Sequence, residues 1–183
     1  YTIKLAIGLA VISISFPQLV ITSMDGVEEY VIGFDTTIAG VIEGQFNGSG
    51  FQPVPSSGQL DSDGIIATGM SDGDMVFGDM AVIGDFARGI DSSSPSNGVS
   101  TGGIYAFEHT VSDFSLGFQP TGSDASPGEI ILKIQNNTGY AVTHISLDYE
   151  IWTFNDQNRS SSFNFSHSPD NTNYSDESSL DYL

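Results

Sequence analysis

The chain has 183 residues, no cysteine and a formal net charge of −19, with 39% hydrophobic and 11% aromatic residues. This length and hydrophobic content predict a globular domain with its own core. Because so acidic a surface repels phosphate groups and anionic lipid headgroups, we expect neither nucleic-acid binding nor membrane binding by the mature domain. The lack of cysteine excludes disulfides, a thiol nucleophile and cysteine-bound zinc.

The first 24 residues are strongly apolar. Lys4 is followed by a largely apolar stretch over residues 5–14 and then by Pro17. A short basic region before an apolar stretch is typical of an export signal, which predicts an extracellular or cell-surface protein. The β-branched residues also fit a buried strand, or a strand donated to a neighbouring molecule, and a membrane anchor is the third alternative. We therefore divide the chain into this segment, 1–24, and a single domain, 25–183.

The rest of the chain has the pattern of strands separated by turns. EYVIGF, IIATGM, GIYAFEH and FSLGFQ are expected strands. GEIILKIQNNTG, THISLDYEIWTF and SSSFNFSHS alternate apolar and polar residues, which predicts a meander of three neighbouring strands. No window has helical spacing, so we predict an all-β fold, an antiparallel β-sandwich of jelly-roll type. Leu180 and Tyr182 begin another alternation, which predicts a strand cut short and a domain incomplete at its C-terminus.

An acidic, glycine-rich stretch at residues 60–79 surrounds the expected strand IIATGM. It offers Asp61, Asp63, Asp72 and Asp74 as oxygen ligands for Ca²⁺. The spacing departs from an EF-hand loop, because an apolar residue stands where a third ligand belongs and the distal Glu is missing. Asp-Gly pairs are also favoured turn residues. The stretch therefore predicts two hairpin turns first, and a structural calcium site as the alternative.

The segment YEIWTFNDQNR combines aromatic rings with amides and charges. Tyr149 and Trp152 could stack on a sugar, while Asn155, Asp156 and Arg159 hydrogen-bond its hydroxyls. In the other interpretation Trp152 caps the core and Arg159 pairs with a nearby acid. We retain the five residues as the candidate ligand-binding set.

Signals for catalysis and for zinc are weak. Gly-x-Ser-x-Gly occurs at residues 69–73 and 98–102, but no helix is expected after either, as the motif of a nucleophilic serine requires, and the three histidines have no close ligand spacing. Asp148 and Glu150 could be a pair of glycosidase carboxylates, but both fall on the polar side of one expected strand. We therefore expect no enzymatic activity.

Several segments carry a resemblance to a known class of proteins. They are FNGSGFQPVPSSGQLDSDGIIATGMSDGDMVFGD, GDFARGI, GVSTGGIYAFE, LGFQPTGSDASPGEIILKIQNNTG and YEIWTFNDQNRSSSFNFSHSPDNTNYS. Over residues 34–183 the chain resembles secreted β-sandwich modules of marine bacteria and cyanobacteria, often found in large surface proteins with C-terminal sorting signals. The resemblance implies a fold similar to carbohydrate-binding jelly rolls, and it supplies no catalytic residues.

Together these observations predict a secreted, non-catalytic surface or matrix module that binds a glycan or a surface protein, with Ca²⁺ as a stabilising ion. The alternative is a structural subunit that forms filaments by donating its apolar N-terminal strand to a neighbouring copy.

Overall fold

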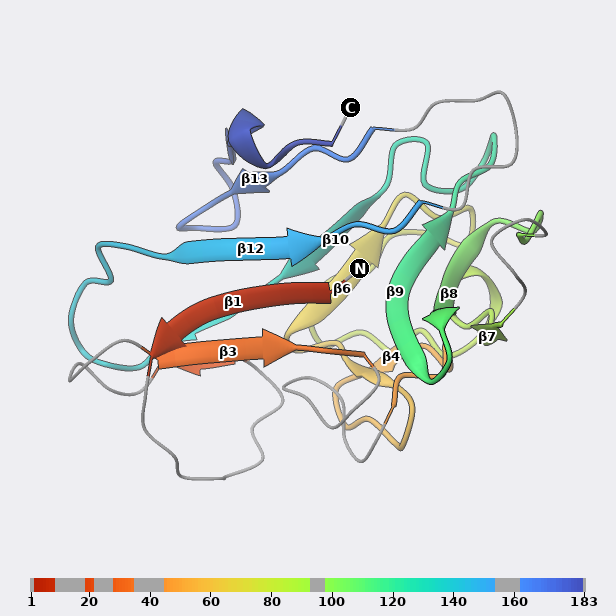
Figure 1. Ribbon diagram of the computed structural model, residues 1–183, viewed down its shortest axis with the longest axis horizontal. Coiled ribbons are helices and arrows are strands. Elements are labelled where there is room, and N and C mark those ends of the chain that lie inside the picture. The colour runs from red at the N-terminus through yellow and green to blue at the C-terminus, as the bar shows by residue number, and fades with distance from the viewer. Residues whose placement is uncertain are drawn as a thin grey trace.

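The computed structural model describes residues 2–8, 19–21, 28–34, 45–92, 98–153 and 162–182. These residues form strands and two short 3-10 helices, so the all-β prediction is confirmed (Figure 1). The elements are β1 (Thr2–Gly8), β2 (Leu19–Ile21), β3 (Glu28–Ile32), β4 (Phe51–Gln52), β5 (Leu60–Asp61), β6 (Ile65–Thr68), η1 (Gly84–Phe86), β7 (Ile90–Asp91), β8 (Gly103–Thr110), β9 (Asp113–Gln119), β10 (Glu129–Leu132), β11 (Ile134–Asn136), β12 (Ser146–Glu150), β13 (Ser166–His167), β14 (Ser175–Asp176) and η2 (Ser178–Leu180).

The longest strand pair is the antiparallel hairpin of β8 and β9. Its register runs from Gly103 opposite Gln119 to Thr110 opposite Asp113, and β7 joins β8 on the other side in parallel. The tight turn after Thr110 contains Ser112 at a φ of 61°. The expected strands GIYAFEH and FSLGFQ are therefore both present, and the short turn between them makes them partners.

The N-terminal segment contributes the middle strand of a second sheet, with the order β12-β1-β3. β1 is antiparallel to β12, from Thr2 opposite Glu150 to Ala6 opposite Ser146, and it is antiparallel to β3 on its other side. Of the alternatives for this segment, the structure thus contains the strand, over residues 2–8. Cleavage of the segment during export stays a prediction.

The predicted meander is wrong. The first segment forms β10, which pairs with β6, and β11, which pairs in parallel with β2. The second forms β12, which pairs with β1, and the third forms β13, which pairs with β14, so the three alternating segments do not pair with one another. Their alternation indicated strands correctly. The alternation did not identify the pairing partners, because a strand with one buried and one exposed face can pair with any strand that has the same two faces.

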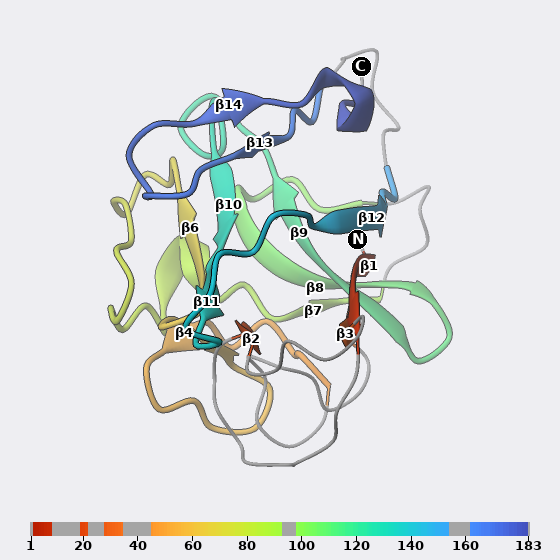
Figure 2. The same ribbon diagram turned by 90° about the vertical axis from the view of Figure 1, so that its left-hand side faces the viewer.

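The C-terminal segment, residues 162–182, folds over β12. β13 and β14 pair with each other, and Phe163 forms a bridge with Tyr182. Both ribbon views place this segment above β12 (Figures 1 and 2). The strand expected from the alternation of Leu180 and Tyr182 is wrong, because residues 178–180 form the 3-10 helix η2.

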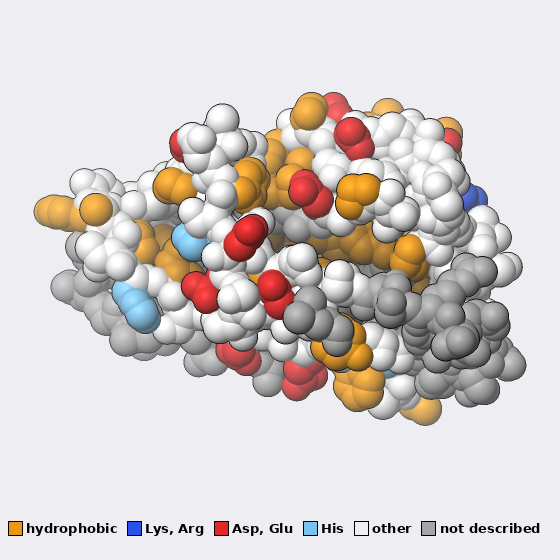
Figure 3. Space-filling model, turned by 90° about the horizontal axis from the view of Figure 1, so that it is seen from above, with side chains coloured by type: hydrophobic (Ala, Val, Ile, Leu, Met, Phe, Trp, Pro, Cys, Tyr) orange, Lys and Arg blue, Asp and Glu red, His pale blue; other side chains and the backbone are white. Residues whose placement is uncertain are grey.

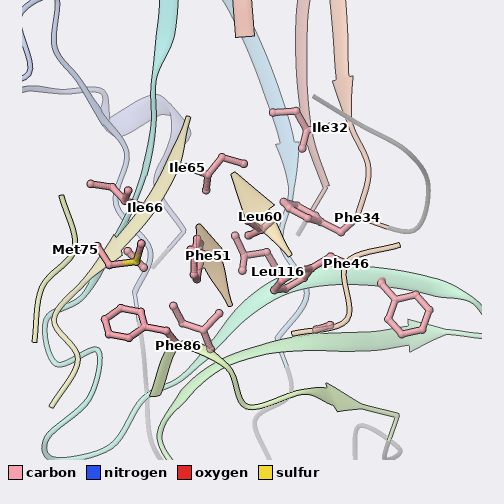
Figure 4. Close-up of a cluster of buried hydrophobic side chains, with 14 of the residues drawn as sticks. Ile32, Phe34, Phe46, Phe51, Leu60, Ile65, Ile66, Met75, Phe86 and Leu116 are labelled. Atoms are coloured by element: carbon pink, nitrogen blue, oxygen red, sulfur yellow. The ribbon is translucent and has the colours of Figure 1, made fainter. Parts of the chain in front are cut away.

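The core consists of aromatic and aliphatic side chains from most of the described elements (Figure 4). Phe51 meets Phe86 edge to face at 6.4 Å between ring centroids, and Phe34 meets Phe46 in the same way at 6.1 Å. Burial of each such ring stabilises the fold by about 1.5–3 kcal/mol. Leu147 of β12 packs against this cluster from its margin, which fixes β12 to the body of the domain.

Candidate functional site

A groove lies between β12 and the C-terminal segment. Its volume is about 410 Å³. It is lined by Leu147, Asp148, Tyr149, Ile151, Ser179, Leu180, Asp181 and Tyr182. Figure 3, which looks down on the molecule from above, shows acidic side chains beside hydrophobic ones across the middle of this face. The groove therefore combines aromatic surface, carboxylates and a hydroxyl in one concave place.

The groove is held by one contact between β12 and the C-terminal segment and by others within that segment. The Tyr149 hydroxyl donates a hydrogen bond to the carbonyl oxygen of Leu180, which ties η2 to β12. Phe163 and Tyr182 exchange two backbone hydrogen bonds of 2.8 Å each. The Glu177 carboxylate accepts hydrogen bonds from the hydroxyl and the backbone N–H of Ser179, and these bonds lower the pKa of Glu177. Each contact fixes the backbone that forms one wall.

Tyr149 lies at the closed side of the groove. Its ring stacks on Phe165 at 6.1 Å and meets Phe163 at 5.6 Å between centroids. Burial raises the pKa of Tyr149, and the charge of Asp181 adds to the effect. Tyr149 thus supports the wall and keeps its proton. Tyr182 has 45% of its surface exposed and is the more accessible aromatic residue of the groove.

The two carboxylates of the groove differ in their neighbours. Asp148 is exposed and lies opposite Lys4 in the register between β12 and β1. Asp181 accepts the N–H of Phe165 at 2.8 Å through Oδ1. A ligand hydroxyl that enters the groove therefore meets one carboxylate that the backbone holds in place, Asp181, and one that is exposed, Asp148.

Trp152 lies just beyond β12 and has different neighbours from Tyr149. Its indole stacks on the His109 ring with 4.4 Å between centroids and 27° between planes, and 41% of Trp152 is exposed. The expected stacking pair of Tyr149 and Trp152 is therefore divided between the C-terminal segment and the β8–β9 hairpin. The other members of the candidate set, Asn155, Asp156 and Arg159, lie outside the described residues.

His109 is held by two polar side chains of β9. Its Nε2 lies 3.1 Å from Asp113 Oδ2 and its Nδ1 lies 3.1 Å from Ser115 Oγ. These contacts have the order of a Ser-His-Asp triad. Ser115, however, is only 2% exposed, so a substrate carbonyl cannot reach its Oγ. The arrangement fixes the imidazole plane behind Trp152.

The acidic stretch forms two turns, one at each end of β6, but the hairpin expectation is wrong, because β6 pairs with β10 and β5 pairs with β4. At the second turn, Asp72 and Asp85 cap each other: Asp85 Oδ2 accepts the N–H of Asp72 at 3.0 Å, and Asp72 Oδ2 accepts the N–H of Asp85 at 2.9 Å. Asp85 also accepts from Ser71 Oγ at 2.7 Å and pairs with Arg88. A Cβ on Gly84, which has a φ of 64°, would lie 1.9 Å from Asp72 Oδ2, so this network requires glycine there.

Two further carboxylates at this turn also accept hydrogen bonds from the backbone. Asp74 Oδ1 accepts the N–H of Gly69 at 2.7 Å. Asp124 accepts the Thr121 hydroxyl at 2.7 Å and the N–H of Ser71 at 2.9 Å, and these bonds hold the pKa of Asp124 well below its ordinary value. The carboxylates around this turn thus cap backbone N–H groups, which is the role that the turn interpretation gave them.

The first turn contains a buried acid with an unsatisfied oxygen. Asp61 and Ser62 are both 0% exposed. Asp61 Oδ1 accepts the N–H of Asp63 at 2.7 Å, whereas Asp61 Oδ2 and Ser62 Oγ have no partner among the described residues. Burial raises the pKa of Asp61 to about 6, against an ordinary value of 3.8. Asp61 and Asp63 lie before β6 while Asp72 and Asp74 lie after it, so the four expected ligands form two separate pairs.

Within the described part of the chain, no three histidine or acidic side chains are grouped so that they could hold a metal ion. The same residues contain no helix that is both long and apolar enough to span a membrane. Calcium binding stays a prediction. Comparisons with protein-family models, with curated proteins and with solved structures give no significant match.

Proposed function

We propose that this chain is a secreted, non-catalytic β-sandwich module of jelly-roll type that binds a glycan in the groove between β12 and η2. The observation that carries the proposal is the groove itself. It places the accessible ring of Tyr182 beside the carboxylates of Asp148 and Asp181. Sugar-binding sites need such a combination, because a pyranose offers an apolar C–H face to a ring and hydroxyls to acceptors.

The size and the charge of the groove limit the ligand. A volume of about 410 Å³ falls within the usual range for small-molecule sites, about 300–1,000 Å³. None of the lining residues is basic. A sulfated or uronic-acid polymer would therefore bring its negative charges toward Asp148 and Asp181 in a molecule of net charge −19. We accordingly propose a neutral glycan as the ligand.

The proposed extracellular location rests on the apolar N-terminal segment and the acidic, cysteine-free composition. Mass spectrometry of the exported protein tests the location, because a cleaved signal leaves a new N-terminus within or just after residues 1–24. Export without cleavage would be consistent with the folded β1.

A glycan array with two matched tyrosine variants tests the ligand proposal. Tyr182→Ala removes the accessible ring of the groove, and we expect binding weaker by about two- to tenfold, because one aromatic stacking contact contributes about 0.5–1.5 kcal/mol. Tyr174→Ala is the control, because Tyr174 is 47% exposed and does not line the groove. Binding that is unchanged in Tyr182→Ala, or lost equally in both variants, would contradict the site.

The position of β1 favours a second candidate function, polymerisation by strand donation. Among the described residues β1 is the only strand that pairs with either β12 or β3, and it fills the space between them. The same sequence in a neighbouring copy would fit the same place, because the register depends on the strand and not on the chain that supplies it.

Disulfide trapping separates the two states of β1. Ala6 and Ser146 are Cα partners across an antiparallel pair, where Cα atoms lie about 4.5–5.5 Å apart, and this spacing allows a disulfide. The natural chain has no cysteine, so the variant Ala6→Cys with Ser146→Cys has only this pair. A ladder of cross-linked oligomers on a non-reducing gel supports donation. Cross-linked monomer alone excludes it.

A further inference from the structure

The surroundings of Trp152 extend the candidate site beyond the groove. Ile151 lines the end of the groove, and Trp152 follows it directly in the chain. At about 3.3 Å per residue, Trp152 lies up to about 10 Å from Tyr149 along an extended backbone. Among the described residues β12 is an edge strand of its sheet, which gives a ligand a route from one face to the other. The exposed indole is thus the next ring that a ligand leaving the groove would meet.

The indole is also held in one orientation from behind. The His109 ring is stacked against it, and Asp113 and Ser115 hydrogen-bond the two nitrogens of that imidazole. The imidazole side chain is only 2% exposed, whereas 41% of Trp152 is exposed. One face of the indole therefore rests on a rigid support while the residue stays accessible, which is the arrangement that a stacking contact requires.

We propose that Trp152 is an outer contact of the same glycan site, so that the ligand is an extended neutral oligosaccharide lying along β12 and not a single sugar. His109 is a positioning residue for this contact. The inference rests on the proposed function, because it assigns a length to the ligand of the groove. A single sugar ring is too short to reach both Tyr182 and Trp152, so affinity should depend on chain length.

Oligosaccharides of increasing length test the proposal. The probes are two-, four- and six-unit oligomers of β-1,3-glucose, β-1,4-glucose and β-1,4-N-acetylglucosamine, measured by calorimetry. For the series that binds, we expect at least a tenfold gain in affinity from two to six units. Trp152 is the only tryptophan in the chain, so its emission should also change with the long oligomers and not with the short ones.

Three variants identify the residues responsible. Trp152→Ala should reduce the gain in affinity from two to six units to less than threefold, and it should leave the affinity for the two-unit oligomer unchanged. Tyr182→Ala should weaken all lengths. His109→Gln should reduce the gain in part, whereas the control His144→Gln should leave it intact, because His144 is exposed and bonds only Ser146. Circular dichroism and thermal unfolding verify that each variant is folded.

The outcomes separate the two proposals. Affinity that is independent of length, or a gain with length that survives Trp152→Ala, overturns the extended ligand and leaves glycan binding in the groove standing. Failure of every oligomer, together with a blank glycan array, overturns the proposed function and this inference with it.

Discussion

Two acidic regions of this molecule use their carboxylates in different ways. Around residues 69–85, Asp72, Asp74 and Asp85 accept hydrogen bonds from backbone N–H groups and hold turns together. At the groove, Asp148 is exposed, and Asp181 lies beside the accessible ring of Tyr182. The sequence drew attention first to the glycine-rich region, where the aspartates are densest.

The difference shows that the density of acidic residues is a poor guide to a binding site. A carboxylate that caps a turn is fixed by the backbone, and removing it leaves the N–H groups of that turn without their acceptor. An exposed carboxylate beside an accessible aromatic ring can accept hydrogen bonds from a ligand, and it contributes little to stability. Substitutions in the two regions should therefore act on different properties, stability in the first and binding in the second.

The largest effect is expected at Asp85. Asp85→Ala removes a buried acceptor of three hydrogen bonds and leaves Arg88 without its partner. We expect the free energy of unfolding to fall by about 2–4 kcal/mol, because the donors of Ser71, Asp72 and the half-buried Arg88 all lose a buried acceptor. Urea unfolding measures this loss. In Asp79→Ala, a change at a half-buried turn residue, the loss should be about 0.5–1 kcal/mol. Equal losses in the two variants would contradict the network.

A second test uses the buried carboxyl of Asp61. Its pKa in the folded state is about 6, above the ordinary value of 3.8, so the folded state favours the protonated form. This stability is complete below pH 3.8 and is lost as the pH rises through 6. Asp61→Asn should therefore be more stable than the natural chain at pH 8, by about 1–3 kcal/mol, and equal to it near pH 3.5. Urea unfolding in EDTA across this pH range measures the difference.

The control for this series is Asp79→Asn, the same carboxyl-to-amide change at a half-buried turn position. The gain in stability at pH 8 should be larger for Asp61→Asn than for this control. Asp61→Asn that is less stable than the natural chain at pH 8 in EDTA would show that the charged carboxylate is satisfied in the folded state.

The smallest effect concerns calcium. The predicted ligands form two pairs, and Asp61 Oδ2 in the first pair has no partner among the described residues, so any calcium stabilisation should depend on Asp61 and Asp63. At a calcium concentration ten times the dissociation constant the gain would be about 1.4 kcal/mol. Thermal unfolding with CaCl₂ should show a rise that Asp63→Asn abolishes and Asp74→Asn retains. A melting temperature that does not change with CaCl₂ would contradict the calcium prediction.

Local patterns predicted the elements well and their partners poorly. The strands at Ile65–Thr68, Gly103–Thr110 and Asp113–Gln119 were expected from apolar composition and turn residues. The pairings of β10, β11 and β12 were not, because each joins a strand that is distant in sequence. Alternation indicates which face of a strand is buried, but it does not indicate which strand pairs with it.

The candidate site was likewise predicted in part: local residues were identified, but their contacts with distant segments were not. Tyr149 and Trp152 were identified as aromatic residues in a polar segment, but Tyr182 was missed because it looked like the start of a strand. Its place in the groove depends on the bridge to Phe163 and on η2. His109 was missed as the support of Trp152, because nothing local relates two rings that are 43 positions apart (152 − 109). Both features arise only when the C-terminal segment and the β8–β9 hairpin are folded against β12.

Backbone amide shifts recorded during titration with the bound oligosaccharide test the division between the two regions most directly. The largest changes should fall on residues 147–152 and 179–182, with small changes over residues 60–79. Changes that concentrate on residues 60–79 and leave the groove unaffected would place the ligand at the acidic turns and contradict the account.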